Sequence, residues 1–126
     1  MRTVETVLLP FELTNGNDGQ GGRWFSSAKI RKKFEAVLRL EYPARRPFGF
    51  PVVVHVTRII GKGQRLWDSS SIGRGSWKEW EDAMVAVGFF HDDGPKYITE
   101  TRFFQDDSRR DEGPKIEVSI FRKGEQ

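Results

Sequence analysis

The run from Val52 to Ile60, VVVHVTRII, is β-branched along most of its length. Valine, isoleucine and threonine fit the pleated surface of a sheet, where their branched side chains pack against neighbouring strands. The run is therefore predicted to be a central strand, and the other elements of the chain have to be arranged around it.

A helix is predicted from Ser76 to Val87, after a polar loop that contains Asp68. Ser76 and Glu79 form the S-x-x-E pattern of a capping box, in which each side chain binds a free backbone N–H group of the first turn. Gly88 follows at the position where glycine commonly ends a helix in the left-handed conformation. One face of this helix is apolar and is expected to lie in the core: Trp77, Trp80, Met84 and Val87.

The N-terminal half of the chain is predicted to supply one strand and one helix. Residues Thr3 to Leu13 are rich in valine, leucine and phenylalanine, and Pro10 favours an edge strand or a bulge. Ser26 or Ser27 can cap a helix that continues to about Leu40. Its apolar stripe has helical spacing: Ile30, Phe34, Val37 and Leu38. Its other face is basic: Lys29, Arg31, Lys32, Lys33 and Arg39.

Two further strands are predicted, from Tyr97 to Gln105 and from Ile116 to Phe121. A long polar turn from Asp106 to Gly113 separates them, so we expect these two strands to form a hairpin. The order β-α-β-α-β-β gives a mixed four-stranded sheet with two helices packed on it, an α/β (α+β) fold. At 126 residues the chain is expected to form a single domain, residues 1–126.

Composition and charge exclude some classes of function. The chain has no cysteine, which excludes disulfides, thiolate catalysis and cysteine-based zinc sites. Its 21 lysines and arginines exceed its 18 aspartates and glutamates, and the net charge of +3 permits a polyanionic partner. No apolar run has the length of a membrane span, and the N-terminus lacks the apolar region of a signal peptide. We therefore expect a cytoplasmic protein without membrane association.

An ordered set of polar residues extends from Asp68 to Asp93. Asp68-Ser69-Ser70-Ser71-Ile72 precedes the helix, Lys78 and Asp82-Ala83-Met84 lie within it, and Gly88-Phe89-Phe90 leads to Asp92-Asp93. In this order, and with this arrangement of strands and helices, the chain resembles a divergent member of the RusA-type Holliday-junction resolvases, a family of endodeoxyribonucleases. Weaker matches to that family are Leu8-Leu9-Pro10, Thr57-Arg58 and Gln105.

The resemblance implies a metal-dependent site that hydrolyses phosphodiesters in branched DNA during recombination or repair. It implies that Asp68 and Asp93 bind Mg²⁺ and that Lys78 lies near the scissile phosphate, which makes these three the expected catalytic residues. Ser70 stands where the family has a further acidic ligand, so one carboxylate of the family's site is replaced.

Four aspartates are candidate metal ligands: Asp68, Asp82, Asp92 and Asp93. Asp82, Asp92 or Glu81 could take the place of the carboxylate that Ser70 replaces. A site with two aspartates remains chemically possible, because Mg²⁺ commonly binds one or two carboxylates together with water and substrate phosphate. Mn²⁺ is a possible alternative, since it accepts looser geometry.

Basic residues are candidate DNA contacts, because lysine and arginine contacts to phosphate supply much of the affinity for DNA. The candidates are Lys29, Arg31, Lys32, Lys33, Arg45, Arg46 and Arg74. The resemblance implies a four-way junction as the partner. Because such a junction presents two symmetric strands to cut, a homodimer is expected.

The same residues also have ordinary structural interpretations. Asp68 can stabilise a turn, Asp92 and Asp93 can belong to another, and Lys78 with Asp82 can form an exposed ion pair on one helix. A RusA-like fold without catalysis, which binds DNA or a protein, is therefore the second hypothesis. The nuclease hypothesis predicts that Asp68 and Asp93 lie at the same end of the sheet, with Asp82 and Lys78 nearby.

Overall fold

The structure is a computed structural model that describes residues 2–10, 27–67 and 77–125. Along the chain, strand β1 (Glu5–Leu9) is followed by helix α1 (Ser27–Glu41) and strand β2 (Val52–Ile59). Helix α2 (Trp77–Val87) then precedes strands β3 (Ile98–Asp106) and β4 (Lys115–Arg122). The predicted order β-α-β-α-β-β and the mixed four-stranded sheet with two helices are confirmed.

The strands lie in the order β1-β4-β2-β3. Strand β2 is paired on both sides, parallel to β3 and antiparallel to β4, which confirms the prediction of a central strand for VVVHVTRII. Strand β1 is at the edge and pairs only with β4 among the described strands. The edge position agrees with Pro10, which directly follows the strand and has no N–H group to donate.

The predicted hairpin between the last two strands is wrong, because β2 lies between β3 and β4. Residues 107–114 instead cross the end of β2 to reach the far side of that strand. The crossing is tight: a Cβ atom on Gly113 would lie 2.6 Å from the carbonyl oxygen of Ile60, so only glycine fits there. The alternating pattern identified both strands correctly, but it carries no information about which strands become neighbours.

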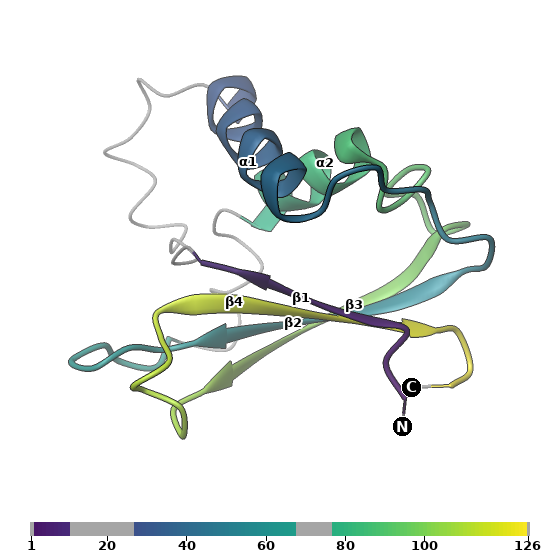
Figure 1. The fold of residues 1–126 in the computed structure, drawn as a ribbon. Coiled ribbons are helices and arrows are strands. Elements are labelled where there is room, and N and C mark those ends of the chain that lie inside the picture. Colours follow the sequence, from purple (N-terminus) through teal and green to yellow (C-terminus); the bar gives the residue numbers. More distant parts are fainter. Residues whose placement is uncertain (1, 11–26, 68–76, 126) are drawn as a thin grey trace.

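Both helices lie on one face of the sheet (Figure 1). The core between them and the sheet includes Val54 and Val56 of β2 and Trp80 and Met84 of α2, all at most 1% exposed. Phe34 of α1 stacks on Trp80 with ring centroids 3.7 Å apart, which joins the two helices. The prediction that the tryptophan face of α2 belongs to the core is thus confirmed.

Gly88 ends α2 with a φ of +100°, in the left-handed conformation that the sequence predicts. A Cβ atom at this position would also lie 2.8 Å from the carbonyl oxygen of Arg45. The buried rings of Phe89 and Phe90 follow immediately and anchor the chain against the core. In the described part of the chain, neither helix is long and apolar enough to cross a membrane.

Candidate functional site

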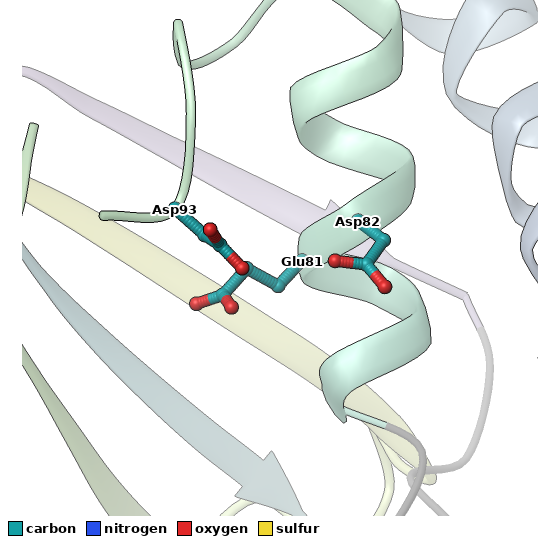
Figure 2. Close-up of side chains that lie close together, drawn as sticks. All are labelled: Glu81, Asp82 and Asp93. Carbon is teal, nitrogen blue, oxygen red and sulfur yellow. The ribbon is translucent and has the colours of Figure 1, made fainter.

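Three carboxylates meet beside α2. Glu81 and Asp82 project from the helix, and Asp93 approaches them from the loop that follows it (Figure 2). One oxygen from each residue lies within 4.8 Å of the others, which is a spacing that could hold a metal ion. We call these three residues the carboxylate cluster.

The local sequence explains why Asp93 returns to the helix. Gly88 reverses the chain direction at the end of α2, and the buried Phe89 and Phe90 fix the next two residues. The loop is then held by its own hydrogen bonds: the N–H of Asp93 donates to Oδ1 of Asp92 at 2.8 Å. Gly94 closes the loop, because its carbonyl oxygen accepts from the N–H groups of residues 97 and 98 at 3.0 Å.

Lys78 lies at the centre of the cluster and contacts all three carboxylates. Its Nζ donates to Asp93, lies 3.1 Å from Oδ1 of Asp82 and 3.5 Å from Oε1 of Glu81. The predicted i, i+4 pair between Lys78 and Asp82 is therefore present, but it is part of a larger network. The lysine side chain is 59% exposed, whereas that of Glu81 is only 15% exposed.

The contacts within this network shift the pKa values of Lys78 and Asp93 in opposite directions. Hydrogen bonds to Asp93 and then to Asp82 raise the pKa of Lys78, so the lysine stays protonated. The hydrogen bond from Lys78 lowers the pKa of Asp93. Burial raises the pKa of Glu81, and the attraction to Lys78 offsets only part of that rise. Asp93 therefore stays ionised at neutral pH, whereas the raised pKa makes Glu81 easier to protonate than an exposed glutamate.

A pocket of about 330 Å³ extends from the cluster toward α1. Asp82 and Asp93 line one side of it, and Arg31 and Glu35 of α1 line the other. Arg31 is held there by Glu35, with Nε 3.4 Å from Oε2. The pocket thus brings one residue of the basic helix face into the neighbourhood of the carboxylates.

The structure brings together several of the predicted site residues and leaves others undescribed. Lys78, Asp82 and Asp93 form one contact network, and Asp92 lines the same pocket. Asp68, Ser70 and Arg74 lie outside the described residues. The predicted proximity of Asp68 to Asp93 therefore stays a prediction.

The predicted DNA contacts divide into two groups. Lys29, Lys32, Lys33 and Arg46 are exposed. Arg45 is different, because it pairs with Glu5 and its guanidinium lies over the Phe89 ring at 4.4 Å. Its contribution to DNA binding stays a prediction, but the contacts give it a role in tying β1 to the turn after α2.

A partly buried polar cluster joins the ends of β2 and β3 to the segment that leads to Asp68. Arg58 is 3% exposed, donates to Oε1 of Gln105 at 2.9 Å and lies over the Trp67 ring at 3.7 Å. The Gln105 amide binds both backbone groups of Trp67, accepting from its N–H at 2.7 Å and donating to its carbonyl oxygen at 2.8 Å. Trp67 directly precedes Asp68 in the sequence.

Sequence reasoning underrated two residues of the site. Glu81 was considered only as a substitute ligand, although its i, i+3 spacing from Lys78 places it on the same face of α2. Glu35 was not considered, because nothing in the sequence shows that α1 packs beside α2.

No family model matches the sequence, and a search of curated proteins finds no match either.

Proposed function

We propose that the chain is a metal-dependent endonuclease that hydrolyses phosphodiesters in branched DNA. The observation that carries this proposal is the carboxylate cluster of Glu81, Asp82 and Asp93 around Lys78. The RusA-type resemblance names Lys78 and Asp93 as catalytic residues, and these two are in direct contact across 15 residues of sequence.

The ligand chemistry of the cluster fits a hard divalent cation. Mg²⁺ and Mn²⁺ bind carboxylate oxygens, and Asp82 and Asp93 offer them in the lining of the pocket. A bound cation would supply a water of lowered pKa and neutralise charge that develops on the phosphate. By the resemblance, Asp68 is a further ligand. Glu81 must be deprotonated to serve as one, so we expect cation binding to weaken as the pH falls.

Lys78 has a second role in this proposal. Its ammonium group occupies the space between the carboxylates, so it competes with a cation for the same oxygens. Because the side chain is 59% exposed, it can turn outward and place its charge beside a DNA phosphate. A lysine ammonium is well suited to stabilise the charge on the phosphate as a compact point charge.

The test is cleavage of a synthetic four-way junction with Mg²⁺ and with Mn²⁺. We expect weak nicking by the natural protein, stronger with Mn²⁺ than with Mg²⁺, because Ser70 contributes no negative charge. Ser70→Asp should increase nicking with Mg²⁺, and Asp93→Asn should abolish it. Asp111→Asn serves as the matched control, because Asp111 is an exposed carboxylate in the connection between β3 and β4.

The second candidate function is binding without catalysis. The observation in its favour is that Lys78 already neutralises part of the cluster, as an ordinary ion-pair network would. In that case the natural protein binds the junction but does not nick it, and Ser70→Asp brings no gain although folding and junction binding are intact. Salt-sensitive binding to the junction is expected under both functions, so cleavage is the measurement that separates them.

A further inference from the structure

The pocket beside the carboxylate cluster has a second wall, which the nuclease proposal leaves without a role. This wall belongs to α1, which packs beside α2 and supplies Arg31 and Glu35. Helix α2 adds an apolar strip of Val85 and Ala86. The remaining lining residues are aspartates: Asp82, Asp92 and Asp93. One pocket thus combines a guanidinium, a set of carboxylates and an apolar surface.

Arg31 is oriented by Glu35, one helical turn further along α1. Its Nε is buried and lies 3.4 Å from Oε2 of Glu35, whose side chain is only 15% exposed. Because Nε makes this contact, the two Nη groups remain as donors for a ligand within the described part of the chain. Arg39 pairs with the same glutamate at 3.1 Å, but it does not line the pocket. Glu35 therefore holds two arginines, and Arg31 is the one that faces the cluster.

The pocket is too acidic to attract a phosphate by itself. Its lining contains one arginine and four carboxylates, those of Glu35 and the three aspartates. A divalent cation on Asp82 and Asp93 reverses this balance, because a bound cation is the largest charge in such a site. Phosphate binding in the pocket must therefore depend on the cation. Exposed lysines on a helix surface, by contrast, attract phosphate without any divalent cation.

We infer that the pocket binds the phosphate monoester of a nucleotide, between Arg31 and the cation of the proposed function, on which this inference rests. The fork of an arginine commonly takes two phosphate oxygens. The cation then needs a third oxygen. A monoester has three terminal oxygens, whereas a diester inside a DNA strand has only two. The pair of Arg31 and cation therefore suits a terminal phosphate better than a phosphate within a continuous strand.

The rest of the pocket suits the nucleoside part of the ligand. Small-molecule pockets begin at about 300 Å³. A volume of about 330 Å³ accommodates one nucleotide, but not a base pair with its two backbones. The methyl groups of Val85 and Ala86 offer an apolar wall to the sugar or the base. The ligand is therefore a mononucleotide or the phosphorylated end of a DNA strand, which share the same phosphate chemistry.

The test is calorimetric titration of the natural protein with thymidine 5′-monophosphate, with Mn²⁺ at equal concentration in both solutions and then without any divalent cation. We expect a dissociation constant of about 1 mM or below with Mn²⁺, and binding at least about tenfold weaker without it. Thymidine, which has no phosphate, should not bind. A short oligonucleotide is then compared with and without a 5′-phosphate. A gain from the phosphate assigns the pocket to strand ends, and no gain assigns it to free nucleotides.

Arg31→Gln should weaken binding of the nucleotide at least about tenfold, because the guanidinium fork is lost. Arg39→Gln is the matched control, because Arg39 pairs with the same glutamate outside the pocket and should leave the affinity unchanged. Circular dichroism establishes that each variant is folded, and a titration with Mn²⁺ alone establishes that it still binds the cation. Nucleotide binding that does not need Mn²⁺, that survives Arg31→Gln, or that both variants weaken equally overturns the inference.

Two results separate this inference from the nuclease proposal. If Mn²⁺ and the nucleotide bind as expected but the four-way junction is not nicked, the nuclease proposal fails and the nucleotide site stands. If the junction is nicked and Mn²⁺ binds but the nucleotide does not, the nucleotide site fails and the nuclease proposal stands. A protein that does not bind Mn²⁺ contradicts both, and the titration with Mn²⁺ alone reveals this before any nucleotide is added.

Discussion

Gln105→Leu should destabilise the fold more than a single substitution at a half-buried strand position usually does. The substitution keeps the approximate length of the side chain but removes three hydrogen bonds, two to the Trp67 backbone and one from Arg58. A hydrogen bond is worth about 1 kcal/mol in net stability, and one to a charged group about 1.5–3 kcal/mol. Water can replace part of this at Trp67, which is half-buried, so we expect a loss of about 2–4 kcal/mol.

The assay is urea denaturation followed by tryptophan fluorescence, with the free energy of unfolding taken from the linear extrapolation. Gln105→Glu is the graded control: it keeps the two acceptor contacts and adds a charge opposite Arg58, but it loses the bond to the Trp67 carbonyl. Its loss should therefore be smaller than that of Gln105→Leu. If the free energy of unfolding of Gln105→Leu lies within about 0.5 kcal/mol of that of the natural protein, the ends of β2 and β3 are not held by this amide.

Two further predictions concern the sheet and the end of α2. Burial, and then the charge of Arg102, lower the pKa of His55, so the unfolded state binds its proton first as the pH falls. The free energy of unfolding should therefore decrease as the pH falls below about 6.5, and denaturation of His55→Gln between pH 7.5 and 5.5 should show a smaller decrease. Glu81, whose raised pKa adds stability as the pH falls, is present in both proteins and so does not affect the comparison. Gly88→Ala should cost more than about 1 kcal/mol, because the left-handed φ and the contact with the Arg45 carbonyl both exclude a Cβ atom; thermal unfolding of this variant at the midpoint of the natural protein would contradict the assignment.

The sequence predicts the elements of this fold better than their pairing. The β-branched run VVVHVTRII identifies β2 as central because branched side chains pack well on the pleated surface, and a strand with a neighbour on each side offers the most such contacts. The place of β4 could not be predicted, because a hairpin and a connection that crosses one strand have the same local pattern. Gly113 carries a local trace of the crossing, and its meaning depends on the nearby carbonyl of Ile60.

The candidate site shows the same division between local and distant information. The contact of Lys78 with Asp82 follows from helix geometry, and the glycine that ends α2 indicates that the chain turns back there. The approach of Asp93 to Lys78 was expected only through the resemblance to a family. The pocket with Arg31 and Glu35 depends on how α1 packs beside α2, through the stacked rings of the core, and no local pattern records that.

The most direct test of the central claim is calorimetric titration of the protein with Mn²⁺ at neutral pH. The account predicts one cation per chain with a dissociation constant of about 1 mM or below, as for weak oxygen-ligand sites. Asp82→Asn and Asp93→Asn should each weaken binding, Lys78→Met should strengthen it because the competing ammonium is gone, and Asp111→Asn should leave it unchanged. Binding that is absent in the millimolar range, or that is the same in the natural protein and in Asp93→Asn, would contradict the assignment of this carboxylate cluster as a metal site.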